Sequence, residues 1–465
     1  MILGRDEEAI VALSTPRGSG AIALVRLSGS NAVEIVNDMS TLSSGKFLKD
    51  EASHTIHHGH VVDQDKEIID EVLFFLMRSP RTFTGQDVVE ISCHNNPFII
   101  ERVIGRAIEV GARLAKQGEF TRRAFLNNKV DLLQAEAINE LISSQTEFAL
   151  KKSMAQLQGS FSSYISEVEK KTLELLTLVE ASFDFLDEEQ RDFDPDSVIR
   201  QRLAGLLEQI SSIKNTFTQQ QQIKDGIRIA LLGSVNVGKS MLFNSLLKKD
   251  RAIVTDVAGT TRDSIEAGLY RDGNFWSLID TAGLRQTGDV IEQKGIERSI
   301  DEANKSDVII LVYDSSVIKE KEILRQYKKL RDKHGDKIIS VVNKLDIINE
   351  DDQSRILDVI GERAILVSAK KDKNIEIIED RIKEKIEALF HQCKSPFLLN
   401  QRQFHVLAEV EGIVNFLVAE CGNYVHYEII AQHLRELLEH ISELTGKGVT
   451  EQIIDSVFDT FCLGK

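Results

Sequence analysis

The sequence predicts a multidomain protein of α/β and α structure, in which an α/β domain is inserted into a helical domain and an α+β domain precedes both. Three observations support this fold class. The chain has 465 residues, enough for about three domains. Helical apolar periods occur in two separate stretches, and strand-like runs alternate with helix-like runs between them. We expect the following segments: an N-terminal domain at 1–122, the helical domain at 123–222 and 388–465, and the α/β domain at 223–387.

The N-terminal segment contains both strand-like and helix-like apolar patterns. Ala21–Val25 and Glu71–Leu76 have the pattern of buried or half-buried strands, and Pro97–Ala112 has apolar residues at helical spacing. Farther along, one apolar helical stripe runs from Ile165 to Leu186 and another from Ile429 to Ile441. Neither stripe can be buried by its own few helices, so we expect the two to pack together around the inserted domain.

Charge and composition exclude several classes of protein. The difference between 57 Lys+Arg and 73 Asp+Glu gives a net charge of −16, which argues against a protein that grips nucleic acid mainly by its own basic surface. The first residues lack a signal-peptide pattern, and no apolar run is long enough to span a membrane. The 4 cysteines are scattered without metal-site spacing. We expect a reduced, cytoplasmic protein that does not enter a membrane.

A phosphate-binding loop begins the inserted domain. The strand-like run Ile227–Leu232 leads into Gly233–Ser240, which matches GxxxxGK[ST], and a helix pattern follows. Backbone N–H groups of such a loop surround phosphate oxygens, Lys239 adds charge at the β- and γ-phosphates, and the Ser240 hydroxyl binds Mg²⁺.

Three further motifs indicate which nucleotide is bound. A DxxG motif follows a strand at Asp280, Thr281, Ala282 and Gly283; an NKxD motif lies at Asn343, Lys344, Leu345 and Asp346; and Ser368, Ala369 and Lys370 follow another strand. Asp346 can accept two hydrogen bonds from guanine N–H groups that adenine lacks, so a site built around it rejects adenine. Four motifs in this order predict a GTPase.

The segment after DxxG lacks the glutamine that positions water in Ras-type enzymes, because Leu284 stands there. Another group must then assist hydrolysis. Glu292 and Glu297 are candidates, although an arbitrary glutamate in such a segment is most often part of a solvated helix face.

Thr255–Asp263 (TDVAGTTRD), Asp280–Arg285 (DTAGLR) and the C-terminal Cys462–Lys465 (CLGK) together resemble one family, the MnmE (TrmE) tRNA modification GTPases. The resemblance extends along the whole chain and includes Phe83–Asp87 and Gly118–Asn127. It implies hydrolysis that depends on K⁺ and is coupled to pairing of two G domains, with Glu292 orienting the attacking water.

The resemblance also implies a ligand set for the nucleotide and its metal ions. Mg²⁺ would be held by Ser240 and Thr261, and K⁺ by Asn236, Thr255, Val257 and Thr260. The remaining residues of the nucleotide site, beyond the three motifs given above, would be Val237, Gly238, Lys239, Met241, Asp256, Ala258 and Gly259.

By the same resemblance, the N-terminal domain is similar to the folate-binding module of the glycine-cleavage T-protein and dimerises. Arg26, Glu90, Lys129 and Lys465 would hold a 5,10-methylene- or 5-formyl-tetrahydrofolate. Cys462 either assists one-carbon chemistry or packs beside the apolar stripe Ile453–Phe461. The family's His-Gly-Gly is replaced by His94-Asn95-Asn96, a turn that asparagine can support because it tolerates positive φ.

His54, His57, His58 and His60 form a cluster, three of whose members would share one strand face. A polar strand edge explains it better than a metal site. For the whole chain, the resemblance implies a homodimeric GTPase that, with the flavin-dependent partner MnmG, modifies carbon 5 of the tRNA wobble uridine. The alternatives are an RNA-binding ribosome-assembly GTPase, for which no basic GxxG segment follows residue 390, and a folate aminomethyltransferase acting alone.

Overall fold

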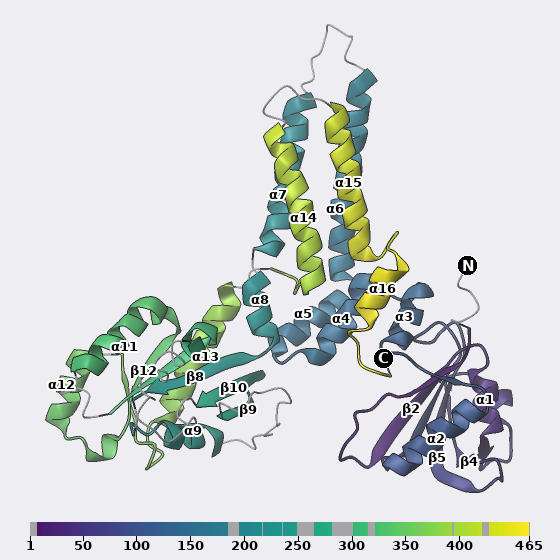
Figure 1. Ribbon diagram of the computed structural model, residues 1–465, viewed down its shortest axis with the longest axis horizontal. Helices are drawn as coiled ribbons and strands as arrows, with labels where there is room; N and C mark the ends of the chain where they lie inside the picture. The colour runs from purple at the N-terminus through teal and green to yellow at the C-terminus, as the bar shows by residue number, and fades with distance from the viewer. Residues whose placement is uncertain are drawn as a thin grey trace, which may run out of the picture. The chain divides into compact units, whose positions relative to one another are not determined.

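The computed structural model describes residues 7–184, 195–215, 217–234, 236–248, 265–280, 301–314, 321–361, 363–392, 395–420 and 427–464. The chain divides into two compact units. The first contains residues 1–139, 155–207 and 405–465, and the second contains 140–154 and 208–404. Each unit is thus built from segments that lie far apart in the sequence (Figure 1).

The N-terminal part of the first unit is a mixed sheet with helices packed against it. The sheet has the strand order β3-β4-β5-β6-β2-β1-β7. The strands are β1 (Ile10–Leu13), β2 (Ile22–Ser28), β3 (Ser40–Leu42), β4 (Thr55–Val62), β5 (Ile68–Met77), β6 (Val88–His94) and β7 (Arg113–Leu114). The helices are α1 (Ala32–Asp38), the short 3₁₀ turn η1 (Leu48–Asp50), α2 (Pro97–Glu109) and α3 (Glu119–Leu126). These elements confirm the predicted strands near residues 21 and 71 and the predicted helix after Pro97.

The side-chain alternation of the strands gives this sheet two different faces. Val25, Leu27 and Val89 belong to a buried cluster that also includes Val103 and Ala107 of α2, so α2 covers that face. Residues that alternate with them, such as Arg26 and Glu90, lie on the opposite face.

The helices of the first unit come from both ends of the chain. They are α4 (Leu132–Ser143), α5 (Glu147–Leu157), α6 (Ser160–Asp184), α7 (Pro195–Lys214), α14 (Gln401–Glu420), α15 (Tyr427–Thr445) and α16 (Glu451–Phe458), of which α4, α5, α7 and α14 extend into the second unit. The predicted packing of the two stripes is confirmed, because α6 and α15 lie against each other (Figure 1). Ile165, Val168 and Leu175 are buried on α6, as are Leu434 and Ile441 on α15, whereas Leu186 lies outside the described residues.

The second unit contains a sheet of strand order β13-β12-β11-β8-β10-β9, parallel except for β9. Its strands are β8 (Ile227–Gly233), β9 (Ile265–Arg271), β10 (Asn274–Asp280), β11 (Val308–Tyr313), β12 (Ile338–Val342) and β13 (Ile365–Leu366). Its helices are α8 (Phe217–Lys224), α9 (Lys239–Lys248), α11 (Lys321–His334), η3 (Gly335–Lys337), η4 (Leu345–Ile347), α12 (Glu350–Ile360) and α13 (Ile375–Gln392). Apolar clusters cover both faces of the sheet, which is the doubly wound arrangement that strand–helix alternation predicts.

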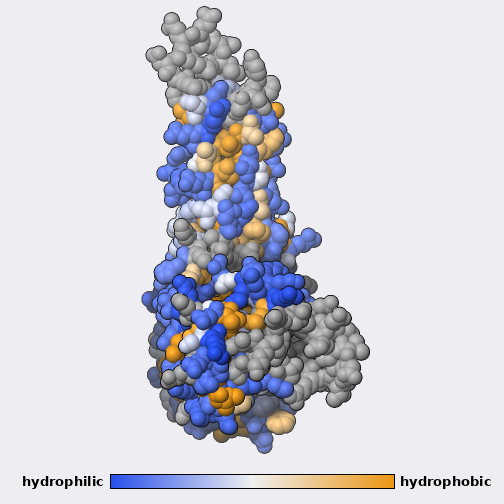
Figure 2. Space-filling view, turned by 90° about the vertical axis from the view of Figure 1, so that its left-hand side faces the viewer, coloured by the Kyte–Doolittle hydropathy of each residue, from blue (hydrophilic) through white to orange (hydrophobic). Residues whose placement is uncertain are grey.

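Hydrophilic residues make up most of the described surface on the face shown in Figure 2, with smaller hydrophobic patches between them. Among the described helices, none is long and apolar enough to cross a membrane.

A buried ionic network fixes the start of α3. Glu119 accepts hydrogen bonds from Arg113 (2.6 and 3.0 Å), from the Lys116 amide (2.8 Å) and from Arg123 (3.1 Å). Arg123 is only 1% exposed, so removal of the carboxylate would leave a buried charge unpaired. Burial alone would raise the pKa of Glu119, but the hydrogen bonds and charges of its partners outweigh it and lower that pKa from 4.5 to about 2.

Glu119→Gln should therefore destabilise the N-terminal domain by about 3 kcal/mol at pH 7. Because the folded-state pKa is lowered, this stabilisation is present above about pH 4.5 and is lost as the pH falls toward 2. The difference in free energy of unfolding between wild type and variant should become smaller over that pH range. Urea unfolding, followed by hydrogen exchange of peptides from α3, measures this free energy. A difference that does not depend on pH would contradict the role of the ionised carboxylate.

Candidate functional site

The sequence motifs of the inserted domain meet at one edge of its sheet. The phosphate-loop motif begins at the end of β8, DxxG begins at the last residue of β10, and NKxD follows β12. Because these strands are parallel, their carboxyl ends lie at the same edge, which is where ligands bind in open α/β sheets.

The phosphate loop runs from β8 to the N-terminus of α9, as the motif requires. Lys239 is buried, and its Nζ donates to the Gly233 carbonyl (2.7 Å) and the Ser234 carbonyl (2.8 Å) across the loop. Asn236 is exposed and has φ of 65°, and Gly238 has φ of 94°, so the loop uses left-handed backbone at two positions. Ser240 and Met241 are exposed in the first turn of α9. The loop can surround a phosphate chain at a helix N-terminus.

Asn343 joins the phosphate loop to the Ser368–Lys370 loop. Its side-chain amide donates to the Val237 carbonyl (2.9 Å), and its carbonyl oxygen accepts from the Ala369 amide (3.0 Å). Asn343 is buried, so both of its polar ends are satisfied by backbone groups of two different loops. Three motifs that are more than 100 residues apart at their extremes are held together by this one side chain.

Asp346 lies beside the Ser368–Lys370 loop. Its Oδ1 accepts a hydrogen bond from the Ser368 hydroxyl (2.6 Å), and this bond lowers the pKa of the carboxyl, with the charges of Lys371 and Lys370 as smaller causes. The carboxylate is therefore held ionised and oriented, and it still has lone pairs to accept N–H groups from a base. Leu345 donates its amide to the Val367 carbonyl (2.9 Å), which fixes the NKxD loop to β13.

Sequence reasoning missed Asp314 as part of this edge. Lys344 forms an ion pair with Asp314 (2.9 Å), which immediately follows β11. A polar residue directly after a buried parallel strand is a usable signal, because such residues lie at the ligand edge of the sheet. Asp314 therefore fixes the side chain of Lys344, the second residue of NKxD, at this edge of the sheet.

Several predicted site residues lie outside the described residues. They are Glu292, Thr255, Asp256, Val257, Ala258, Gly259, Thr260, Thr261, Thr281, Ala282, Gly283 and Lys465. Lys370 is exposed next to Ala369, and only the backbone of Asp280 is described, in register with Leu231 of β8.

A second group of predicted residues lies on the face of the N-terminal sheet opposite α2, which α3 covers in part through Phe120. Arg26 and Glu90 are paired in register on β2 and β6, and their side chains form an ion pair of 2.7 Å. The Gly464 carbonyl, adjacent to Lys465, accepts hydrogen bonds from Arg26 (3.4 Å) and from the Ser14 hydroxyl (3.2 Å). The C-terminal end of the chain therefore returns to this pair, as a shared site requires.

Lys129 is placed differently. Its Nζ donates to the Pro80 carbonyl (2.9 Å), and its stem lies beside Gly85 in the loop between β5 and β6. None of the described contacts of Lys129 involves Arg26 or Glu90. Of the predicted folate residues that the structure describes, only Arg26 and Glu90 contact each other.

The two N-terminal motifs, Phe83–Asp87 and Gly118–Asn127, contact each other. Thr84 shares a hydrogen bond with Ser28 (2.7 Å), and its carbonyl accepts from Asn127 (2.7 Å). Arg123 donates to Gln86 (3.0 Å). Through this contact, α3 fixes the loop that precedes β6.

The His94-Asn95-Asn96 turn does not need glycine here. Neither asparagine has positive φ. Asn95 donates to the Gly18 carbonyl (2.8 Å), and Asn96 caps α2 by accepting from the Phe98 amide (2.9 Å). Asparagine supports the turn, as expected, but through side-chain hydrogen bonds and not through positive φ.

One expectation for the histidine cluster needs correction. His54 has φ of 63° and precedes β4, so it does not share a strand face with His58 and His60. The expected strand edge is present in the first half of β4, because β3 pairs with β4 only at Gly59–Val61. No group of potential metal ligands occurs among the described residues, where His58 bonds instead with Ser43 (2.8 Å) and Glu71 (2.8 Å). Cys462 is exposed and follows the buried Phe461.

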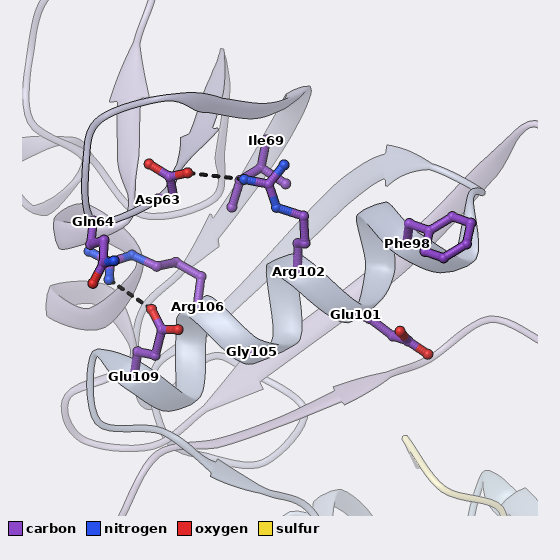
Figure 3. Close-up of a pocket in the computed structure, with 9 residues that line it drawn as sticks. All are labelled: Asp63, Gln64, Ile69, Phe98, Glu101, Arg102, Gly105, Arg106 and Glu109. Carbon is purple, nitrogen blue, oxygen red and sulfur yellow. Dashed lines mark hydrogen bonds and ion pairs between the residues drawn. The ribbon is translucent and has the colours of Figure 1, made fainter.

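A surface cavity of about 480 Å³ lies along α2, at the turn between β4 and β5 (Figure 3). Four of its charged side chains are paired within it, Arg102 with Asp63 (3.0 Å) and Arg106 with Glu109 (3.0 Å). The cavity contains none of the residues that the sequence predicts for a site.

Family comparisons cover almost the whole chain. The family described as MnmE helical domain matches residues 132–462, and that described as GTP-binding protein TrmE N-terminus matches residues 9–129. The tRNA modification GTPase MnmE of Bacillus mycoides is 36% identical over 463 residues, which are 98% of this chain and 99% of the relative. The protein of the same name from Fervidobacterium nodosum is also 36% identical, over 99% of this chain and 98% of the relative.

Solved structures that resemble the protein cover only part of the chain. A variant of Aquifex aeolicus Era bound to GDP and AlF4⁻ is 24% identical, with 34% of this chain and 56% of that chain covered and a TM-score of 0.28. The FeoB G-domain of Methanococcus jannaschii is 24% identical, with 35% of this chain and 98% of that chain covered and a TM-score of 0.25.

Proposed function

The chain belongs to the MnmE (TrmE) family of tRNA modification GTPases, and on that premise we propose that it hydrolyses GTP with the help of K⁺ to drive modification of the tRNA wobble uridine. The product carries a carboxymethylaminomethyl or aminomethyl group at carbon 5, its one-carbon unit comes from a tetrahydrofolate, and a flavin-dependent partner, MnmG, shares the reaction. The observation that carries the proposal is the meeting of the phosphate loop, NKxD and Ser368–Lys370 around Asn343.

Mass spectrometry of tRNA nucleosides tests this function. Cells that lack the gene should lose the modified wobble uridine, and a plasmid copy of the wild-type gene should restore it. An unchanged nucleoside profile in the deletion strain would overturn the proposal. Turnover of methylene-tetrahydrofolate by the purified chain without partner and GTP would instead favour a folate enzyme that acts alone.

The nucleotide site has oxygen ligands that suit Mg²⁺ and K⁺. Ser240 stands at the first turn of α9, where Mg²⁺ bound to the phosphates would find its hydroxyl. Asn236 is exposed at left-handed φ in the phosphate loop, so its side-chain oxygen is free to help hold a monovalent cation beside the phosphates. A cation there would stabilise charge that develops during hydrolysis.

Replacement of K⁺ by Na⁺ should therefore slow GTP hydrolysis at least about tenfold, because the smaller ion does not suit the same ring of oxygen donors. Phosphate release from the purified protein, measured in matched chloride salts, checks this. Asn236→Ala should abolish the difference between the salts, and equal rates in both salts for the wild type would count against a K⁺ site.

The Arg26–Glu90 pair supports binding of the folate. Arg26 and Glu90 are 22% and 19% exposed, so they can meet a ligand while remaining oriented by each other. An arginine suits the glutamyl carboxylates of a folate, and a carboxylate suits the N–H edge of its pterin. Lys465 follows the Gly464 carbonyl that Arg26 already contacts.

Arg26→Ala should weaken binding of 5-formyl-tetrahydrofolate at least about tenfold, because a charge-assisted contact is lost and Glu90 is left unpaired. Isothermal titration calorimetry measures the affinity. Arg102→Ala is the matched control, because it removes an ion pair of similar length from the α2 face of the same domain (Figure 3). Equal loss in both variants would show a general effect on the domain.

The sheet face opposite α2 supports a homodimer. Ile22, Ile56 and Leu73 on this face are 65%, 61% and 40% exposed. Ile56 is in register with Phe75, Glu90 and Arg26, whereas Leu73 pairs with Ser92 and Ile22 with His94 on the same face. A second copy of the same domain would cover these apolar side chains and enclose the ligand.

A further inference from the structure

The β9–β10 hairpin connects the two nucleotide-responsive segments of the chain. β9 begins directly after the TDVAGTTRD segment, and β10 ends at Asp280, the first residue of DxxG. Its tip, Asp272–Gly273, has positive φ at both residues, as a tight two-residue hairpin turn requires. Any change of the two segments with the nucleotide must act on the ends of this hairpin.

The tip is bound to the loop between α4 and α5. The Glu147 amide donates to the Gly273 carbonyl (2.6 Å), and the Phe275 amide donates to the Gln145 carbonyl (2.8 Å). These two bonds flank an antiparallel bridge between Thr146 and Asn274. The Tyr270 hydroxyl also bonds with the Gln145 side chain (2.6 Å). The α4–α5 loop therefore extends the hairpin as a short piece of additional strand.

The same loop is fixed to the start of the α/β domain. The Gln145 amide donates to the Lys224 carbonyl (3.2 Å), and Lys224 forms an ion pair with Glu140 in the last turns of α4 (2.5 Å). Lys224 is the last residue of α8, two residues before β8. The end of α4 is thus held both to the hairpin tip and to the strand that leads into the phosphate loop.

The opposite end of α4 belongs to a different apolar cluster. Leu132 and Ala135 pack with Ile454, Phe458 and Phe461, on and just after α16. The chain then continues to Leu463, which bridges Gln117, and to Gly464, which contacts Arg26. The first turn of α4 therefore packs with α16 and Phe461, and the loop that follows the last turn of α4 is bound to the hairpin tip.

We propose that the α4–α5 loop is the coupling element of this GTPase: its backbone bridge to the hairpin tip passes nucleotide-dependent movement of β9–β10 to α4 and thereby to α16. Gln145, Thr146 and Glu147 act as positioning residues, since they act through the hairpin and α4. The bridge stays closed throughout the cycle and works as a rigid joint. The inference rests on GTP hydrolysis and does not require the proposed folate or the partner.

Glu147→Pro is a selective test. Glu147 is the first residue of α5, and Thr146 caps that helix by accepting from the Ala149 amide (3.1 Å). Proline is well suited to this first helical position and lacks only the N–H that Glu147 donates to Gly273. Glu147→Ala is the matched control, because it removes the exposed ion pair with Lys151 but keeps the N–H.

Hydrogen exchange of the full-length protein, compared between GDP and GDP with aluminium fluoride, should show a nucleotide-dependent difference in α4 and α16. We expect that difference in the wild type and in Glu147→Ala, and an about fivefold smaller one in Glu147→Pro, with GTP hydrolysis within about twofold in all three. Equal differences in the two variants would overturn the proposal. So would a parallel loss of hydrolysis, which would indicate damage to the hairpin itself.

A disulfide provides the reverse experiment. Thr146 and Asn274 form a non-hydrogen-bonded pair, whose Cα atoms are about 4.5 Å apart in such bridges, within disulfide range. Thr146→Cys with Asn274→Cys, added to Glu147→Pro, should restore the exchange difference when oxidised and lose it again when reduced. The two single-cysteine variants control for the lost helix cap. Failure of the oxidised protein to recover the difference would contradict a rigid joint.

Discussion

Gly238→Ala should reduce the affinity of the protein for GDP and GTP at least about 100-fold. An added Cβ would lie 2.2 Å from the Asn343 side-chain nitrogen, and Gly238 has φ of +94°, which alanine adopts only under strain. Asn343 cannot move away easily, because it is buried and bonded to Val237 and Ala369. The phosphate loop and the base-binding loops would then separate.

Titration with a fluorescent guanine nucleotide measures this effect, with circular dichroism to confirm folding. Gly335→Ala is the control in the same domain, because no atom lies within 4 Å of its added Cβ and its φ is not positive. We expect wild-type affinity for Gly335→Ala. Wild-type affinity for Gly238→Ala would show that the contact with Asn343 is not needed for nucleotide binding.

Glu292→Ala should slow GTP hydrolysis about 100-fold or more and leave GTP affinity nearly unchanged. The reason is the missing glutamine after DxxG: with Leu284 in that place, another group must orient the attacking water, and a positioned general base typically contributes this much. A residue that contacts only water at the γ-phosphate contributes little to ground-state binding.

Single-turnover phosphate release and nucleotide titration separate the two quantities. Glu297→Ala is the matched variant, five residues farther along the same segment, and should retain hydrolysis. Unchanged turnover in Glu292→Ala would remove it from its catalytic role, and loss in Glu297→Ala would transfer that role to Glu297.

Much of the nucleotide site could be predicted because its motifs are short and contiguous. The residues of a phosphate loop are neighbours in the chain, and a strand before it with a helix after it suffices to orient its N–H groups. NKxD and Ser368–Lys370 are also each contiguous in the sequence, and each follows a strand. Asp314 was not predicted, because no sequence motif marks the residue that pairs with Lys344. The position of Asp314 directly after β11 was nevertheless a usable signal.

The N-terminal domain was less predictable for a physical reason. Whether Arg26 meets Glu90 depends on the register of β2 against β6, and a shift by one residue would place either side chain on the other face. The basis of the His94-Asn95-Asn96 turn was misjudged because asparagine was considered for its φ tolerance, whereas its side chains bond with Gly18 and cap α2.

By itself, the sequence determined that a guanine-specific α/β domain interrupts a helical domain, since periodicity and contiguous motifs report local backbone structure. Only the tertiary structure decided which distant groups act together: Asn343 between two loops, Glu119 between two arginines, and Gln145–Glu147 on the hairpin tip. Such contacts join residues from about 4 to more than 100 positions apart. These contacts depend on strand register and helix packing. The same local sequence patterns are compatible with several registers and packings, so they do not specify the contacts.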